Sequence, residues 1–104
     1  MFKNINFEPG EVVYNGLDFN IEVPLKEQLF SLKEDLFQVN YYDKYLIDVG
    51  WYPEFDEAGS FNICIVENYN WSDLIFQKKC KEIKQLNQYM LESVNLINKL
   101  LKGK

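Results

Sequence analysis

The segment of residues 45–67 constrains the fold most, because it contains two runs in which apolar and polar side chains alternate. Alternation with a period of two places the apolar residues on one face of an extended chain. These apolar residues are Tyr45, Ile47, Val49, Trp51, Phe61, Ile63 and Ile65. Asp48, Asn62 and Glu67 lie mostly on the other face. We therefore expect two antiparallel strands, half-buried, at the centre of a sheet.

The two runs are separated by residues 53–59, PEFDEAG. The proline lacks a backbone donor and the final glycine permits a positive φ, so the chain leaves the sheet here. This segment, called the acidic loop below, places carboxylates in water beside aromatic rings. The residues concerned are Glu54, Asp56 and Glu57, with Trp51, Tyr52 and Phe55.

Further elements are expected on both sides of this pair. Residues 11–14 and 17–23 flank Asn15-Gly16, a dipeptide that favours a two-residue hairpin turn. Residues 1–10 alternate weakly, which fits an edge strand or a packed arm. Leucines and a valine at spacings of three and four predict an amphipathic helix over residues 24–39.

A second, longer helix is expected at the end of the chain, capped by Ser72 or Asp73. Its apolar stripe is Phe76, Cys80, Ile83, Leu86, Met90, Val94, Ile97 and Leu101. Such a helix would be about 40 Å long, which exceeds the sheet it could cover. Its last turns would then project, bend or pair with a partner.

The order strand, strand, helix, strand, strand, helix predicts an α+β fold. We expect one domain over residues 1–104, with an antiparallel sheet of four to five strands and both helices on one face. Among the phenylalanines, three are expected in the core: Phe30, Phe37 and Phe61.

The residue types present exclude several kinds of chemistry. All 11 basic residues are lysines, and without histidine or arginine the chain has no imidazole base, no Ser/His or Cys/His pair and no guanidinium for phosphate. Cys64 and Cys80 have no metal-binding spacing and are expected to be buried thiols, although a disulfide between them is an alternative. There is no membrane-spanning run and no secretory signal, so we expect a cytoplasmic protein without cofactor or metal.

Charge is divided unevenly along the chain. Residues 1–73 contain 14 acids and 4 lysines, a net charge of −10, whereas residues 74–104 contain 2 acids and 7 lysines, a net charge of +5. The aromatic residues lie in the acidic part, which argues against base stacking in a nucleic-acid groove. Lysines 78, 79, 81 and 84 oppose this argument, but they fit a solvated helix face.

Four interpretations of the acidic loop remain open. It lacks the ligand spacing of a calcium-binding EF-hand, and a catalytic pair of Asp48 with Glu54 or Asp56 has no nucleophile nearby. It could also be a solvated loop without a role. The favoured hypothesis is a surface for a basic protein, because exposed aromatic residues anchor interfaces and carboxylates steer cationic partners. The expected contact residues are Asp48, Trp51, Tyr52, Glu54, Phe55, Asp56, Glu57, Tyr69 and Trp71.

The sequence GWYPEFDEAGSF, followed by Glu67, Trp71 and an amphipathic terminal helix, resembles the small acidic immunity proteins of bacteria. The resemblance covers roughly residues 43–101. It implies a non-enzymatic inhibitor that occludes the active site of a cognate toxin, often a basic nuclease. An alternative from another class is a structural protein that forms a homodimer through its long carboxy-terminal helix.

Overall fold

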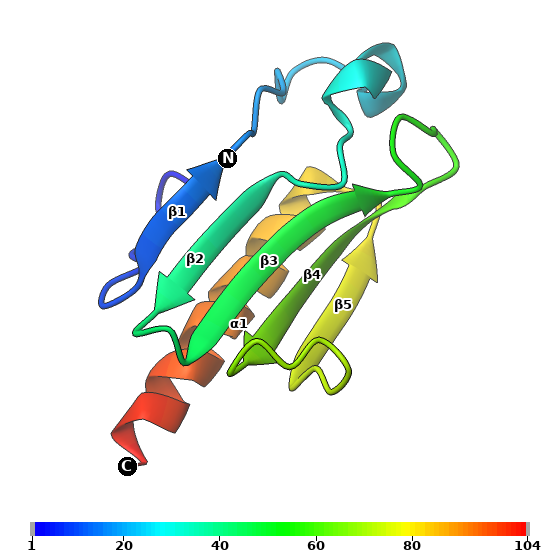
Figure 1. Cartoon of the computed structure of the whole chain (residues 1–104). Coiled ribbons are helices and arrows are strands. Elements are labelled where there is room, and N and C mark those ends of the chain that lie inside the picture. Colours follow the sequence, from blue (N-terminus) through cyan, green and yellow to red (C-terminus); the bar gives the residue numbers. More distant parts are fainter. Residues whose placement is uncertain (1, 104) are drawn as a thin grey trace.

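The computed structural model describes residues 2–103, within which the chain forms an antiparallel sheet of five strands and one α-helix. The strands follow the order of the sequence across the sheet, β1-β2-β3-β4-β5. Their bounds are β1 Glu11–Asn15, β2 Phe37–Tyr41, β3 Tyr45–Tyr52, β4 Ser60–Glu67 and β5 Phe76–Cys80, followed by α1 Ile83–Lys102. Helix α1 crosses one face of the sheet, and no helix covers the other, called the outer face below (Figure 1). The α+β class is confirmed, whereas the expectation of two helices is wrong.

The central strands β3 and β4 confirm the predicted antiparallel pair, but they are buried on both faces over most of their length and not half-buried. Asp48 pairs with Cys64 and Trp51 with Phe61 in their register. The seven apolar residues predicted to share one face lie in one hydrophobic core on the helix side, whereas Leu46, Cys64 and Val66 form a second, smaller cluster on the outer face. Glu67, expected on the other face, pairs in register with Tyr45 on the core side. Phe61 and Phe37 belong to this core, as expected.

Helix α1 closes the core with residues spaced three or four apart, because this spacing aligns them along one side of a helix. Leu86, Met90, Val94 and Ile97 are buried against the sheet, and Leu101 is half-buried. The stripe that we expected to need a partner is therefore covered within one chain up to Ile97. Figure 1 shows that the last turns continue past the end of the sheet.

The helix expected over residues 24–39 is not formed. Two short 3-10 turns, Leu25–Glu27 and Leu29–Ser31, are followed by strand β2. In β2, buried Phe37, Val39 and Tyr41 alternate with half-buried polar residues. The leucine spacings fit a helix, but the aromatic and β-branched residues at every second position fit a strand better.

The expected hairpin of residues 11–14 with 17–23 is also wrong, because β1 pairs with β2 instead. The side-chain oxygen of Asn15 accepts a hydrogen bond from the Leu17 backbone at 3.1 Å. The Gly16 N–H donates to the Leu36 carbonyl at 2.7 Å. Asn15 thus closes a local turn that ends β1 and does not reverse the chain into a second strand.

The carboxy-terminal helix begins at Ile83 and not near Ser72 or Asp73. Phe76 and Cys80 belong to β5. A spacing of four residues returns to the same side of a helix and also to the same face of a strand, so these two positions fitted both structures. The 20-residue helix is consequently about 30 Å long.

The amino-terminal segment is a packed arm. Phe2 is buried, and its ring centroid lies 5.1 Å from that of Phe37. No strand forms in residues 2–10, and Met1 lies outside the described residues. None of the described helices combines the length and apolarity that crossing a membrane requires.

Both cysteines are free and buried, as expected, but they lie on opposite faces of the sheet. Cys80 pairs in register with Phe61 on the core side, and Cys64 pairs with Gln77 and Asp48 on the outer face. The alternative of a disulfide between them is therefore wrong in this fold. Burial raises the pKa of Cys64 to about 12 and also raises that of Cys80.

Candidate functional site

The structure divides the expected contact residues between the two ends of β3. Trp51, Tyr52 and the acidic loop are at one end, whereas Tyr69 and Trp71 follow β4 at the other end. Eight residues of strand span about 23 Å, so one small surface does not join the two groups. Asp48 lies between them on the outer face.

Trp51 is buried in the core and is not available to a partner. Its ring packs edge-on against Phe61, with centroids 4.9 Å apart. Its indole N–H donates to the Asp56 carbonyl at 2.8 Å, and a side chain at Gly59 would collide with this ring. Trp51 therefore anchors the acidic loop instead of forming a contact surface.

The acidic loop packs against the segment that precedes β2. The Phe55 N–H donates to the Leu32 carbonyl at 2.8 Å, and the Glu34 N–H donates to Glu54 Oε1 at 3.3 Å. Phe55 and Phe30 form an edge-to-face ring pair with centroids 5.8 Å apart. Phe30, expected in the core, is 84% exposed. The loop thus presents an exposed aromatic pair beside carboxylates.

Glycine at position 50 allows the chain to cross the outer face. A Cβ at Gly50 would overlap the carbonyl oxygen of Glu34, so the backbone of residue 34 lies directly on β3. The Trp51 N–H also donates to the Lys33 carbonyl at 2.8 Å, which holds this segment against β3. Glu34 and Asp35, which lie in the segment expected from the sequence to be a helix, are therefore brought close to Asp48 and Tyr52.

Asp48 is a buried carboxylate on an open sheet face. Asp48 is only 6% exposed, and Gln38 Nε2 donates a hydrogen bond to its Oδ1 at 2.7 Å. Within residues 2–103, Asp48, Asp35 and Glu34 form no ion pair with a lysine. Burial raises the pKa of Asp48 and the nearby Asp35 adds to this, while the hydrogen bond from Gln38 opposes it.

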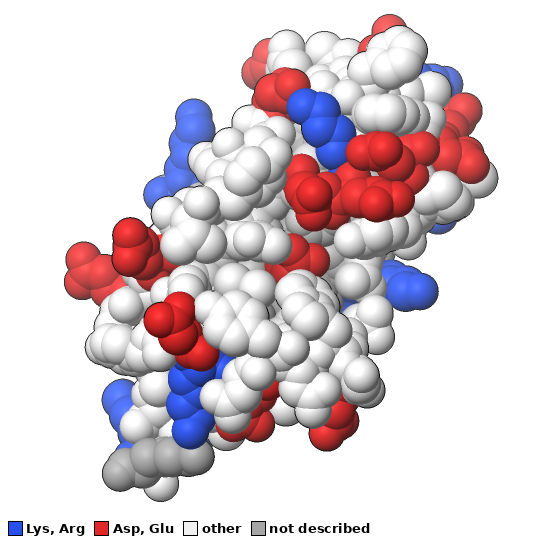
Figure 2. All heavy atoms as spheres, in the orientation of Figure 1, with Lys and Arg blue, Asp and Glu red and all other residues white. Residues whose placement is uncertain are grey.

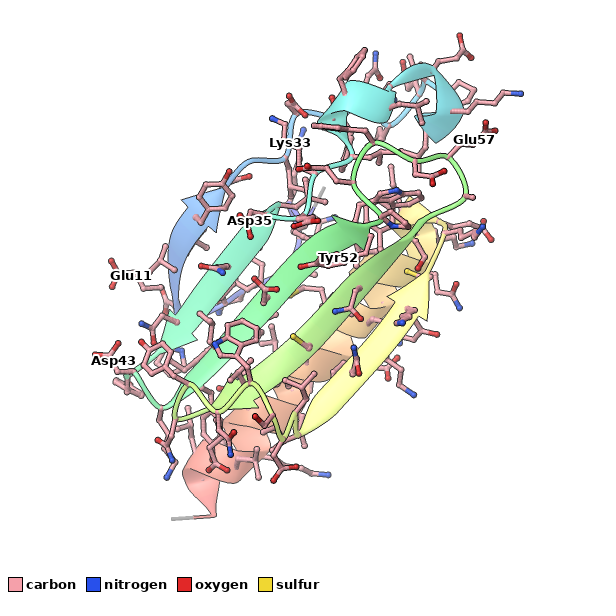
Figure 3. The ribbon with its side chains drawn as sticks, turned by 45° about the vertical axis from the view of Figure 1, so that its right-hand side comes forward. Glu11, Lys33, Asp35, Asp43, Tyr52 and Glu57 are labelled. Carbon is pink, nitrogen blue, oxygen red and sulfur yellow. The ribbon has the colours of Figure 1, made fainter. Side chains whose placement is uncertain are left out.

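Tyr52 borders the same group of carboxylates. Burial raises the pKa of its hydroxyl, and the negative charges of Asp48, Asp35 and Glu34 raise it further. Figure 3 shows Asp35 and Tyr52 over the same end of the outer face. In Figure 2, acidic side chains gather at this end, where β2 begins and β3 ends. We call Glu34, Asp35, Asp48 and Tyr52 the outer-face site.

Two of the three acids in the acidic loop accept hydrogen bonds from backbone N–H groups. Asp56 Oδ1 accepts the Ala58 N–H at 2.8 Å, and Glu54 accepts the Glu34 N–H described above. The Lys81 ammonium lies 3.4 Å from the Ala58 carbonyl, which brings a lysine of the basic part to the loop. Glu57 makes no hydrogen bond within the described chain.

The opposite end of the sheet carries exposed aromatic residues on two tight turns. Tyr42 and Tyr69 both have a positive φ angle of 59°. Their rings are exposed, as is that of Trp71. The Tyr69 hydroxyl donates to Asp43 Oδ1 at 2.9 Å. Hydrogen bonds from Asn40 and then from Tyr69 lower the pKa of Asp43. Tyr69 and Trp71 thus belong to a second surface.

The outer-face site is chiefly a concentration of negative charge. Cys64 lies opposite Asp48, but its pKa of about 12 keeps it a thiol near neutral pH. Within residues 2–103, no group of three or more acids and cysteines is placed to hold a metal ion. What the arrangement can do is attract and orient a cationic group.

Three of these residues were missed from the sequence: Phe30, Glu34 and Asp35. The helix prediction concealed the two acids, because the surface residues of a solvated helix would not lie over a sheet face, and Phe30 had been assigned to the core. One signal was present, since a glycine inside a strand marks a close backbone approach. Gly50 was that glycine, but the sequence does not show which segment crosses it.

No family model, curated protein or solved structure matches this chain.

Proposed function

We propose that the protein is a non-enzymatic inhibitor that binds a basic protein partner through the outer-face site and the adjoining aromatic pair. The binding surface comprises Glu34, Asp35, Asp48 and Tyr52, with Phe30 and Phe55 at its border. Of the residues expected from the sequence, Asp48, Tyr52 and Phe55 are retained, and Phe30, Glu34 and Asp35 are added. The expected residues left out are Trp51, Glu54, Asp56, Glu57, Tyr69 and Trp71.

The observation that carries this proposal is the Asp48 carboxylate. A buried charge is costly to a fold unless an opposite charge or several hydrogen bonds compensate it. Asp48 has one amide partner, and the nearby acids Glu34 and Asp35 increase the unfavourable field. An incoming lysine or arginine would relieve this cost, so binding energy is available to a cationic partner.

The ring pair supports a protein as the partner rather than a free ion. Large aromatic side chains at the edge of a charged surface are typical anchors of interfaces. Phe30 and Phe55 are both exposed. Their contact with one another holds each ring in place before a partner arrives.

The resemblance to immunity proteins suggests the identity of such a partner. A toxin that cleaves nucleic acid has a basic active site, and a group of carboxylates can occupy it in place of phosphates. We therefore propose a cognate bacterial toxin as the partner, a basic nuclease by that resemblance, and the cytoplasm as the place of inhibition.

The alternative function was homodimerisation through the carboxy-terminal helix. Its motive was an uncovered apolar stripe, but Val94 and Ile97 are buried against the sheet. No observation on this helix favours the alternative over the proposed inhibitor.

A co-expression experiment tests the proposal. A toxin domain encoded beside the gene should arrest growth when it is expressed alone, and this protein should restore growth and purify with the toxin. Replacing Glu34 by Gln and Asp35 by Asn should weaken the rescue. Growth arrest that the wild-type protein does not relieve, with no complex formed, would contradict the proposal.

A further inference from the structure

A hollow lies between helix α1, the first residues of the amino-terminal arm and the loop of residues 18–21. Its volume is about 880 Å³, which is within the usual range of small-molecule sites. No residue of the outer-face site lines it. One wall is α1, which lies on the face of the sheet opposite that site (Figure 1). The hollow is therefore a separate candidate for ligand binding.

The wall formed by α1 has a direction along the helix. Its residues are Lys84, Asn87, Gln88 and Leu91. Positions three, four and seven residues apart lie on the same side of a helix. With a rise of about 1.5 Å per residue, Lys84 and Leu91 are about 10 Å apart along the axis. The wall thus has a cation at one end and an apolar side chain at the other.

Apolar side chains line much of the hollow. Phe2 is buried, and Ile5 and Phe19 pack against the hydrophobic core. Ile21 and Leu91 also line the hollow, and these large apolar residues are 65% and 44% exposed. A ligand with an apolar body would remove part of this surface from water, which favours binding.

The charges that line the hollow favour an anion. Lys3 and Lys84 are exposed, and neither forms an ion pair within residues 2–103. Asp18 also lines the hollow, but its carboxylate lies 3.9 Å from the Lys33 ammonium, which offsets its charge. The hollow therefore has an excess of positive charge, although the chain as a whole has a net charge of −5.

Amide side chains of the lining add further hydrogen-bond donors. Asn87 Oδ1 accepts the Phe2 N–H at 3.3 Å, and Asn20 Oδ1 accepts the Glu22 N–H at 3.0 Å. Within the described chain, the side-chain nitrogens of Asn87 and Asn20 have no acceptor. A carboxylate only accepts hydrogen bonds, so ammonium groups and amide nitrogens suit it as partners.

We propose that this hollow binds a free amphipathic carboxylic acid. Its carboxylate lies among Lys3, Lys84 and the amide side chains, and its apolar chain extends along α1 toward Leu91. A cationic ligand of the same shape would be repelled by the two ammonium groups. A free acid fits better than a membrane, because the apolar residues line a hollow and do not form the face of an amphipathic helix lying in a lipid surface.

Nuclear magnetic resonance titrations with octanoate and octanamide test the proposal, because these two ligands share an apolar chain and differ in charge. The wild-type protein should bind octanoate more tightly than octanamide. Lys3→Gln/Lys84→Gln should weaken octanoate binding about five-fold, as expected for exposed charges, and leave octanamide binding unchanged. The matched control Lys99→Gln/Lys102→Gln removes two exposed lysines of α1 outside the hollow and should bind octanoate like the wild type.

The same titrations locate the ligand. The backbone amide signals that shift should belong to residues 84–91 and 18–21, and not to residues 48–52 of the outer face. Leu91→Gln should weaken the binding of both ligands, since it removes an apolar contact that they share. No shift with octanoate at millimolar concentration, equal affinities for the two ligands, or unchanged octanoate binding in Lys3→Gln/Lys84→Gln would overturn the proposal.

Sedimentation with phosphatidylglycerol vesicles examines a lipid surface as the source of the anion. The protein should remain in the supernatant, because the proposed ligand is a free acid. Binding to the vesicles that Lys3→Gln/Lys84→Gln abolishes, without binding of octanoate, would assign these lysines to a membrane contact and overturn the proposal.

Discussion

At the scale of single residues, Asp48 and Gly50 have opposite relations to stability. Gly50 is required by the close approach of the Glu34 backbone, so the fold depends on it. Asp48 contributes a buried charge without a cation nearby, so the fold would be more stable with a neutral side chain. A residue that costs stability and lies on an open face is a candidate for function.

Replacing Asp48 by Asn should increase the free energy of unfolding at pH 7. Asn keeps an oxygen that can accept the hydrogen bond from Gln38 and removes the charge. The gain in the free energy of unfolding should be on the order of 1 kcal/mol, which is comparable to the cost of burying a polar group that lacks hydrogen-bond partners. Urea denaturation of both proteins measures it.

The stability difference between Asp48→Asn and wild type should depend on pH, in a direction set by the pKa of Asp48. The folded-state pKa of Asp48 is raised, so the folded protein binds this proton more tightly than the unfolded chain. Stability from this group is present below the unfolded pKa and is lost as pH rises through the folded pKa. The advantage of Asp48→Asn should therefore shrink as pH falls toward the ordinary value of 3.8. A variant less stable than wild type at pH 7 would refute this account of Asp48.

At the scale of elements, the sequence predicted those segments whose periodicity was long and unambiguous. For strands β3 and β4 the antiparallel pairing and the core face were predicted correctly, whereas the burial of their second face was not. The helix predictions for residues 24–39 and 72–82 were wrong. In residues 72–82, Phe76 and Cys80 are four apart, which fits a helix and a strand equally. In residues 24–39 the leucine spacings fit a helix, but the alternation over residues 37–41 belongs to β2. Only the tertiary pairing of β2 with β1 and β3, and of β5 with β4, decides between helix and strand.

The candidate site could be predicted only in part for the same reason. Tyr52 and the loop acids lie beside a strand that was correctly placed. Glu34 and Asp35 reach the outer face only because an irregular segment crosses Gly50, and this path depends on contacts distant in sequence. The burial of Trp51 was likewise not decided by the sequence, because an aromatic residue at a strand end suits a core or an interface.

The segment that crosses β3 can be tested by adding one methyl group. Gly50→Ala should destabilise the fold by about 1–3 kcal/mol, as overpacking does elsewhere, because the new Cβ overlaps backbone that cannot rotate away. Gly103→Ala is the matched control, since its Cβ would lie 3.6 Å from the Lys99 carbonyl oxygen, an ordinary van der Waals contact. Thermal unfolding should separate the two variants. Equal midpoints would mean that the crossing does not constrain residue 50.

At the scale of the whole molecule, the charge division of the sequence becomes a division in space. The acid-rich residues 1–73 supply β1 to β4 and the outer-face site, whereas the lysine-rich residues 74–104 supply β5 and α1. Helix α1 lies behind the sheet, on the face opposite the outer-face site (Figure 1). A basic partner is therefore expected to approach the outer face, where long-range attraction is strongest.

The central claim is that Glu34 and Asp35, with Asp48, form the surface that receives a basic partner. The most direct test is the association kinetics of the toxin domain encoded beside the gene, measured over a range of salt concentrations. The variant Glu34→Gln/Asp35→Asn should associate more slowly and with a flatter salt dependence than wild type. The control Glu82→Gln/Glu92→Gln removes the same charge from the carboxy-terminal part and should retain more of the wild-type rate. Equal losses in the two variants, or no loss in either, would contradict the account.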